Sequence, residues 1–379
     1  MSNYNVVHVP ESAMEGSGGV VTAMFELIAR SKHFCTPKVV TVDYGAPCVE
    51  VEGVTVLSSA PKWYGRFWRY TPTMSQNLKA SFKRNSVIHI HGIWMSPQWI
   101  AGRYAIAHEI PFIITPHNML GGWLWKRGKI RRLKKSLYWK YLVEPIFRQA
   151  AAIHALTGEE ARTLKEFFPD TPIVTIPNGI DLDNILEQLP TAPTESERYF
   201  LFLGRLHPVK GLELIFQALA KVPVSMRIPL IVAGSAISES YSRALTALVS
   251  ELGIEAAVEF VGPVSGVKKW TLLSGALAVC APSYSEGMSM VALEAMACST
   301  PVVTTHASGF SELASWGGVL INSDFDELHV ALMDVIGWSL DERAKRGAKG
   351  CDLVRHHYTW DVVAQSYDGL YQQALEVNL

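Results

Sequence analysis

Paired cysteines are missing from this chain of 379 residues, and their absence limits how it can be stabilised. Its five cysteines are an odd, scattered set, and none forms a Cys-x-x-Cys pair. We therefore expect neither a disulfide framework nor a zinc site. This cysteine usage fits a reducing cytoplasm best.

Excess charge and long apolar runs are lacking as well. The formal net charge is −1 with 18% charged residues, so no basic domain points to nucleic acid as a partner. No apolar run reaches the roughly 18–20 residues that a membrane-spanning helix needs, and we predict none. The N-terminus leads straight into an apolar segment, Val6–Val9, without a preceding basic region, so we expect no secretory signal.

Apolar residues, in contrast, make up 49% of the chain, enough for two domains of ordinary size with large cores. Short apolar runs alternate with helical segments, a pattern typical of α/β domains with parallel sheets. The polar, proline-containing stretch 189–198 is the best candidate for a linker. We therefore expect one domain over 1–188 and a second over 199–359.

The strongest functional pattern lies in Tyr284–Val303. An apolar run at 276–281 predicts a buried strand, a loop follows, and good helix formers then predict a compact helix that ends at Ser-Thr-Pro. This layout places Glu286 in the loop. It places Glu294 about two turns inside the helix.

A loop and helix of this kind suit a phosphorylated sugar. Amides near Met288–Val291 belong to the first helical turn and lack partners within the helix, so they form an anion site. Glu286 can bind sugar hydroxyls and Glu294 ribose hydroxyls, because a carboxylate accepts two hydrogen bonds. Two glutamates on a solvated helix face are the alternative. The apolar surroundings of Glu294 and the position after a parallel strand weigh against it.

The sequence Glu-Gly-Met-Ser-Met-Val-Ala-Leu-Glu-Ala-Met-Ala-Cys-Ser-Thr-Pro-Val-Val resembles the signature of the family 4 retaining glycosyltransferases. Residues 204–211, Gly-Arg-Leu-His-Pro-Val-Lys-Gly, resemble the family's Gly-Arg-Leu…Lys-Gly motif, and weaker matches lie at 16–19, 115–118 and 177–181. The chain departs from the family at Met288 and Ser289, where Phe-Gly is usual, and at Ser299, often Gly. The hydroxyl of Ser289 would stand where an amide approaches phosphate and would tune donor choice or rate.

The resemblance implies a GT-B fold, in which two Rossmann-like domains with parallel sheets face an interdomain cleft. The C-terminal domain would hold the donor, and the last helix, 360–379, would cross back to the first domain. The implied reaction moves a hexosyl unit from a UDP- or GDP-sugar to a hydroxyl of a glycan or polyprenyl-linked acceptor, with retention. A bacterial surface-polysaccharide role is the type that we expect.

Positive charge in the loop after residue 203 suits the donor diphosphate. Arg205 offers a planar fork and Lys210 a mobile point charge, and both would stabilise the leaving nucleoside diphosphate. No metal or other cofactor is then needed. No side-chain nucleophile is evident, and the resemblance implies front-face attack assisted by the leaving phosphate. The predicted donor-binding set is Gly18, Gly19, Arg205, Lys210, Glu286, Gly287, Met288, Ser289, Met290, Val291 and Glu294.

Glycines near the N-terminus allow a second interpretation. Gly16 and Gly18, with Asp43 further on, suggest a dinucleotide-binding fingerprint, but they lie well past the strand end and position 21 is Val. We favour Gly18-Gly19 as a pair that lets backbone amides approach the donor diphosphate. A simple turn is the alternative.

Two histidines lie in the predicted strand 86–91 of the first domain, and a third follows the predicted strand 111–115. His89 and His91 alternate onto one strand face, but a metal site would need a third ligand that the sequence does not identify. A core role is favoured for each, with His91 better placed at the strand end. His117 matches a family histidine near the transferring sugar, and we expect a hydrogen-bonding or acid/base role. The predicted catalytic set is His117, Glu286, Arg205 and Lys210.

The most basic stretch runs over 126–140 and contains no acidic residue. It is either a solvated helix face or, with its adjacent Trp residues, a contact for an anionic membrane surface or a lipid-pyrophosphate acceptor. Peripheral association at the inner face of the plasma membrane would follow from the second interpretation. The acceptor-side candidates are His91, Asn118, Trp123, Lys126 and Arg127.

Two other functions compete with transfer. One is a nucleotide-sugar epimerase or phosphorylase on a similar scaffold, which needs no external glycan acceptor or needs a bound cofactor. The other is a degenerate scaffold subunit. The intact set of Arg205, Lys210, Glu286 and Glu294 argues against the scaffold.

Overall fold

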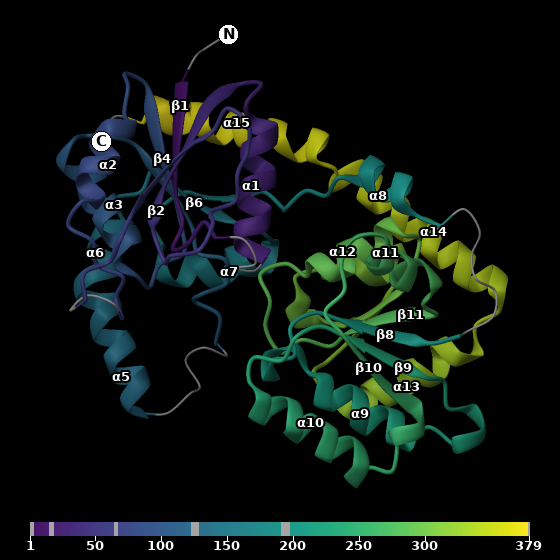
Figure 1. Ribbon diagram of the computed structural model, residues 1–379. Coiled ribbons are helices and arrows are strands. Elements are labelled where there is room, and N and C mark those ends of the chain that lie inside the picture. Colours follow the sequence, from purple (N-terminus) through teal and green to yellow (C-terminus); the bar gives the residue numbers. More distant parts are fainter. Residues whose placement is uncertain (1–3, 15–18, 64–66, 123–128, 191–197, 378–379) are drawn as a thin grey trace. The chain divides into compact units, whose positions relative to one another are not determined.

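The computed structural model describes residues 4–14, 19–63, 67–122, 129–190 and 198–377. The chain forms two compact units, which we call unit 1 (Met1–Gly179 with Trp360–Leu379) and unit 2 (Ile180–Thr359) (Figure 1). Each unit contains one parallel sheet with helices on both faces. Helices on both faces bury the central strands, which explains the near-continuous apolar sequences of those strands.

The sheet of unit 1 has the order β3-β2-β1-β4-β5-β6-β7. Its neighbouring strands pair in parallel. The strands are β1 (Tyr4–Val9), β2 (Cys35–Val42), β3 (Thr55–Ser59), β4 (Ser86–His91), β5 (Phe112–Thr115), β6 (Ala152–Ala155) and β7 (Ile173–Thr175).

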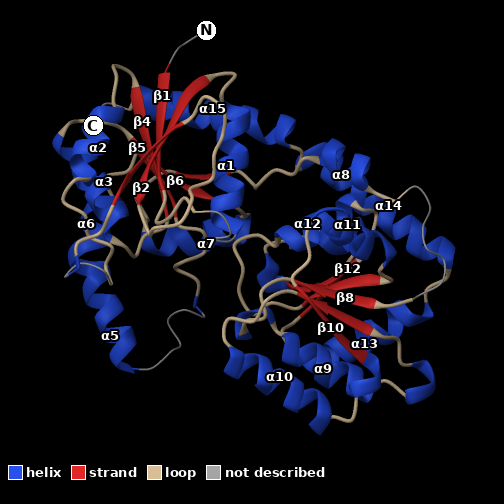
Figure 2. Ribbon diagram, viewed as in Figure 1, coloured by secondary structure: helices blue, strands red, loops and turns tan. Residues whose placement is uncertain are grey.

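Helices cover both faces of this sheet, with α1 and α15 on one face and α2, α3 and α6 on the other (Figure 2). A π-helical turn, η2, joins α5 to α6. The bounds are α1 (Gly19–Ser31), α2 (Met74–Ser81), α3 (Ser96–Ala107), α5 (Lys129–Tyr138), η2 (Trp139–Val143), α6 (Glu144–Phe147), α7 (Gly158–Phe167) and α15 (Trp360–Glu376).

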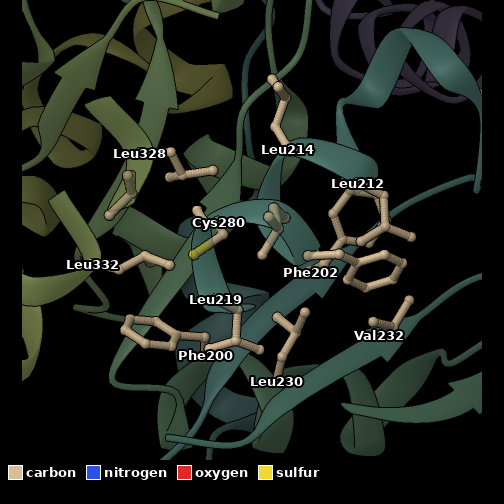
Figure 3. Close-up of a cluster of buried hydrophobic side chains, with 14 of the residues drawn as sticks. Phe200, Phe202, Leu212, Leu214, Leu219, Leu230, Val232, Cys280, Leu328 and Leu332 are labelled. Atoms are coloured by element: carbon tan, nitrogen blue, oxygen red, sulfur yellow. The ribbon is translucent and has the colours of Figure 1, made fainter. Parts of the chain in front are cut away.

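The sheet of unit 2 has the order β10-β9-β8-β11-β12-β13, and its strands are again parallel. In its core, Phe200 and Phe202 of β8 belong to one apolar cluster with leucines of α9 and α13 (Figure 3). The strands are β8 (Phe200–Leu203), β9 (Leu230–Ala233), β10 (Val258–Gly262), β11 (Ala278–Ala281), β12 (Val302–Thr305) and β13 (Val319–Ile321).

The helices of unit 2 form two layers, with α9, α10 and α13 on one face of the sheet and α11, α12 and α14 on the other (Figure 2). Several short 3₁₀ turns connect them, among them η3 (Pro208–Lys210) and η6 (His306–Ser308). The helices are α8 (Leu182–Gln188), α9 (Leu212–Lys221), α10 (Glu239–Glu251), α11 (Gly266–Gly275), α12 (Met290–Ala297), α13 (Phe325–Gly337) and α14 (Leu340–His357).

The division between the units falls before α8, upstream of the predicted linker 189–198. Helix α8 belongs to unit 2 because it packs on α11 and α12, and Trp270 Nε1 donates to Gln188 Oε1 at 3.1 Å. The last helix, α15, begins at Trp360 and packs in the core of unit 1, as the resemblance implied. Within the described ranges, no helix is long and apolar enough to cross a membrane.

Each sheet has one point at which the strand order reverses. In unit 2 it lies between β8 and β11, and in unit 1 between β1 and β4. Loops that leave adjacent strands in opposite directions open a crevice there, and open α/β sheets bind ligands at this point. The loops after β8 and β11 contain Arg205, Lys210 and Glu286.

Candidate active site

Two loops of unit 2 pack backbone against backbone at this switch point. Gly211 has a φ of 68°, and a Cβ there would lie 2.2 Å from the carbonyl oxygen of Pro282. The amide of Tyr284 donates to the carbonyl of Val209 at 2.8 Å and ties the loops together. Only glycine fits at position 211, because any side chain would push the loop after β8 away from the loop after β11.

Glu286 sits at the centre of these loops, with a side chain that is 9% exposed. Its Oε1 forms an ion pair with Lys210 Nζ and accepts a hydrogen bond from Ser283 Oγ at 2.6 Å. The Glu286 amide donates to Ala307 in η6 at 2.9 Å. One carboxylate oxygen is thus held by the protein. The other, Oε2, makes no hydrogen bond or ion pair with the residues that the structure describes.

Arg205 follows β8 directly and is exposed. Among the described residues, nothing forms an ion pair or hydrogen bond with its guanidinium. The cation is therefore available to an anion from solvent, whereas Lys210 is already paired with Glu286.

The start of α12 corrects one prediction. Ser289 was predicted to be a donor-binding residue at a position where an amide approaches phosphate, but its amide donates to Ser308 at 3.1 Å, and its buried hydroxyl accepts from Ala292 at 3.4 Å. Ser289 is therefore the N-cap of the helix. Within the described structure, the first-turn amides that make no hydrogen bond are those of Met290 and Val291. Met288 is buried beside them, and Gly287 is partly exposed.

Glu294 lies inside α12 and carries a partner that the sequence did not reveal. Lys269 Nζ of α11 donates to its Oε1 at 2.6 Å, and this ammonium also lies 4.5 Å from the ring centroid of Trp270. Burial raises the pKa of Glu294, while the charge of Lys269 opposes that rise. The side chain is 16% exposed, so the predicted placement off the open surface is confirmed.

In unit 1, the turn after β5 holds His117 and Asn118 in an unusual backbone conformation. Both residues have positive φ values, 52° and 58°, in the left-handed region. The buried carboxylate of Glu160 accepts from the amides of Asn118 and Leu156, which fixes the turn against α7. Strain of this kind gathers at functional sites, and Glu160 is a residue that supports this turn.

A buried polar layer lies on the face of the unit 1 sheet that α15 covers. Side chains on this face are apolar in the middle of the strands and polar two residues further on, toward the carboxyl ends. The apolar positions are Val6, Val87, Ile113 and Ala152, and the polar ones are His8, His89, Thr115 and His154.

Hydrogen bonds join the side chains at these strand ends into two groups. His89 bonds Tyr371 at 2.9 Å through Nδ1 and Thr115 at 2.7 Å through Nε2, and Thr115 continues to His154 at 2.7 Å. His91 bonds His8 at 3.0 Å and His117 at 3.2 Å. His91, an acceptor-side candidate, is therefore buried and reaches a ligand only through His117.

The sequence identified no third histidine near His89 and His91, and His8 of β1 occupies that place. Ring nitrogens of the three lie within 4.8 Å of one another. Burial lowers the pKa of His8 and His117 to about 3 and that of His154 to about 4. Burial also lowers the pKa of His89 and His91 well below the usual value. The layer is consequently uncharged at neutral pH.

The described part of the basic stretch, residues 129–140, forms α5 and the start of η2, and one side of it packs on unit 1. Tyr138 accepts from Trp68 at 2.9 Å, and Trp139 is buried against Phe167 and Phe168. The opposite side exposes Leu133, Leu137 and Tyr141, which are 61%, 48% and 67% exposed. Residues four apart share one helix face, so this face is an apolar stripe among lysines and arginines.

Four predicted site residues, Gly18, Trp123, Lys126 and Arg127, lie outside the described residues. Gly19 begins α1, and a Cβ there would meet nothing within 4 Å. Its place in the turn therefore has no steric requirement for glycine.

A cavity of about 620 Å³ lies elsewhere in unit 2, between β13 and α13. Asp326, Glu327 and Asp334 are among its lining residues. The described lining includes no cation, so the charge is wrong for a diphosphate. We place the candidate donor site at the loops after β8 and β11 instead.

Comparisons with known proteins agree with this geometry. A family model described as Glycosyltransferase Family 4 matches residues 17–184, and one described as Glycosyl transferases group 1 matches residues 187–347. D-inositol 3-phosphate glycosyltransferase of Xylanimonas cellulosilytica is 29% identical over 76% of this chain and 72% of its own.

Two solved structures share the fold over nearly the whole length. Sucrose-phosphate synthase from Thermosynechococcus elongatus has a TM-score of 0.76 at 20% identity, covering 98% of this chain and 99% of its own. HepE of Anabaena, solved in complex with UDP-glucose, has a TM-score of 0.74 at 17% identity, covering 97% and 99%.

Two parallel-sheet Rossmann-like units define the GT-B fold, which both solved structures share. The chain belongs to the family 4 glycosyltransferases, and it is a transferase.

Proposed function

We propose that this protein transfers a hexosyl unit from a nucleoside-diphosphate sugar to a hydroxyl of a glycan or lipid-linked acceptor, with retention and without a metal. The observation that carries the proposal is the Lys210–Glu286 ion pair at the switch point, with Arg205 in the same loop as Lys210 and with Glu286 in the loop that leads into α12. Cations and amides together can neutralise a diphosphate.

Each group of the donor site has a separate task in this proposal. Arg205 and Lys210 hold the diphosphate and stabilise the charge that develops on it as it leaves. Glu286 keeps Oε2 for a sugar hydroxyl, and Glu294 keeps Oε2 for a ribose hydroxyl. The Anabaena HepE structure contains UDP-glucose, which supports a UDP-sugar as the first donor to test.

In unit 1, we assign His117 to the transferred sugar and Asn118 to the acceptor side. The turn that carries them is held by Glu160 in a conformation that costs energy. Such strain is retained where it serves a ligand.

Donor turnover in the presence of a chelator tests the proposal. UDP-, GDP- and ADP-hexoses are incubated with the enzyme, and proton NMR follows the anomeric proton of the first sugar product. We expect one donor class to be turned over with its configuration kept. Lys210→Gln should lower the rate by about a hundredfold, since it removes a charge-assisted contact to the leaving group.

Lys221→Gln is the matched control, because Lys221 also pairs with a carboxylate, that of Asp326, but is exposed at the far end of α9. Interconversion of the sugar without release of nucleoside diphosphate would support the epimerase instead. Absence of turnover with every donor and acceptor would support the scaffold.

We further propose that α5 rests on an anionic membrane surface. The apolar stripe Leu133, Leu137 and Tyr141 is exposed, and Arg132, Lys134 and Lys140 are exposed around it. An amphipathic helix with basic flanks binds anionic lipid in this way. This placement suits a polyprenyl-linked acceptor and a peripheral location.

Vesicle flotation tests this proposal. The protein should float with vesicles containing anionic lipid and not with neutral ones, and salt should weaken the binding. Leu133→Ser with Leu137→Ser should abolish it. Val330→Ser is the control, because Val330 is 66% exposed on α13, a helix that contains no lysine or arginine. Equal flotation of the double variant and the control would contradict the proposal.

A further inference from the structure

Three histidines form a line from the core of unit 1 to the turn after β5. His8 Nδ1 lies 3.0 Å from His91 Nε2, and His91 Nδ1 lies 3.2 Å from His117 Nε2. The far end of the line is His8 Nε2, which is buried and has no hydrogen-bond partner among the described residues. The line therefore ends in the core at His8, and at the turn after β5 it ends at His117.

A metal ion fits this cluster poorly, although three histidines are close together. The rings of His89 and His91 lie with centroids 4.2 Å apart and planes 33° apart, so they are nearly stacked and their in-plane lone pairs do not converge. Both nitrogens of His89 are engaged by Tyr371 and Thr115. The contacts therefore describe a hydrogen-bonded line.

The line fixes where each proton lies. All three rings are neutral because burial lowers their pKa values, and a neutral imidazole donates through one nitrogen and accepts through the other. A proton on His8 Nε2 would be a buried N–H without an acceptor, which is rarer in proteins than an unused acceptor. His8 therefore carries its proton on Nδ1 and donates to His91 Nε2.

The same reasoning assigns the ring protons of His91 and His117. His91, accepting at Nε2, carries its proton on Nδ1 and donates to His117 Nε2. His117, accepting at Nε2, carries its own proton on Nδ1. That N–H makes no hydrogen bond with the described residues, so it is free to donate to a ligand.

We propose that His91, directed by His8, is a positioning residue that fixes His117 as the Nδ1–H tautomer, so that His117 acts as a hydrogen-bond donor and not as a general base. The ligand atom is a hydroxyl or phosphate oxygen. The identity of that ligand rests on the proposed function, whereas the tautomer does not.

Nitrogen-15 NMR of protein labelled at histidine tests the tautomer directly. Two-bond proton–nitrogen correlations distinguish protonated from bare ring nitrogens, and His117→Asn assigns the signals of His117. We expect His117 to be protonated at Nδ1. His91→Leu should release His117 into a mixture of tautomers, and His91→Asn, which keeps an amide donor at the δ position, should restore the single form.

His33→Gln, at an exposed position, is the control that should leave these signals unchanged. Protonation of His117 at Nε2, or a tautomer unaffected by His91→Leu, would overturn the proposal. A change of the signals on adding a chelator would overturn it too, in favour of a bound metal. If His91→Leu does not fold, the wild-type tautomer and His91→Asn still decide.

Turnover gives an independent readout. His117→Asn keeps a donor at the δ position and should lose less kcat than His117→Gln, which places its amide at the ε position, and His117→Ala, each of which should lose about a hundredfold. Greater activity of His117→Gln than of His117→Asn would overturn the proposal. If no donor is turned over by the wild-type protein, the proposed function fails while the NMR result stands.

Discussion

At the scale of single residues, Glu286 and Glu294 of unit 2 each pair with a lysine, and only one of these two lysines could be identified from the sequence. Lys210, the partner of Glu286, stands in a loop motif beside Arg205, and the sequence identified it. Lys269, the partner of Glu294, has no motif around it, because α11 and α12 meet only in the folded chain. A sequence pattern shows the groups that one loop gathers, but not a pair made across two helices.

Replacement of Lys269 by Met tests the role of this second pair. Glu294 would lose the cation that opposes the rise of its pKa by burial, so it would be less ionised and less well oriented. We expect nucleoside-diphosphate affinity to fall about tenfold, equivalent to about 1.4 kcal/mol. Calorimetric titration measures it.

Lys268→Met is the control, because the neighbouring Lys268 is exposed on the same helix. In a Glu294→Gln background, Lys269→Met should have little further effect, since its partner is gone. Equal affinities of the two lysine variants would contradict this role.

At the scale of elements, the strands of unit 1 end in a layer of polar side chains, and the alternation of residues along the predicted strand 86–91 indicated part of this layer. His89 and His91 were predicted to share a face, and they do. That His8 and His154 lie in the same layer could not be predicted, because no local sequence pattern gives the strand order that brings β1, β4 and β6 into one sheet. The edge strand β3 was not predicted, because its residues are mostly accessible and form no apolar run.

The neutral histidine layer predicts how stability depends on pH. The pKa values of His8, His117 and His154 are lowered to about 3, 3 and 4 by burial, so the unfolded chain binds more protons than the folded one below about pH 6.5. Stability is therefore complete above pH 6.5 and is lost as pH falls. Each such histidine contributes a slope of about 1.4 kcal/mol per pH unit.

Urea unfolding between pH 7.5 and 5 measures this dependence. Burial raises the pKa of Glu160 and Glu294, so above the ordinary pKa of a glutamate these two groups make stability fall as pH rises. The net slope of stability against pH should therefore be smaller than the sum over the histidines, but positive. His89→Phe should reduce the slope, and the exposed His33→Phe should not. A midpoint that is constant or rises on acidification would contradict the neutral layer.

At the scale of the whole molecule, unit 2 places its candidate donor loops where the strand order reverses, between β8 and β11. The alternation of strands and helices and the family motifs were sufficient to predict two parallel-sheet domains, and the comparisons and the topology confirm them. The point of division was harder to predict. Helix α8 precedes the polar linker in sequence, yet it packs with unit 2. The unit to which a helix belongs depends on its packing, which the composition of the linker does not show.

Calorimetric titration of the protein with UDP, GDP, ADP and NAD in the presence of a chelator tests the central claim most directly. We predict that one nucleoside diphosphate binds and NAD does not. The double variant Arg205→Gln with Lys210→Gln should bind that nucleotide about a hundredfold less tightly, because it removes two charge-assisted contacts. Binding of NAD, or unchanged nucleotide binding by the double variant, would contradict a donor diphosphate site at these loops.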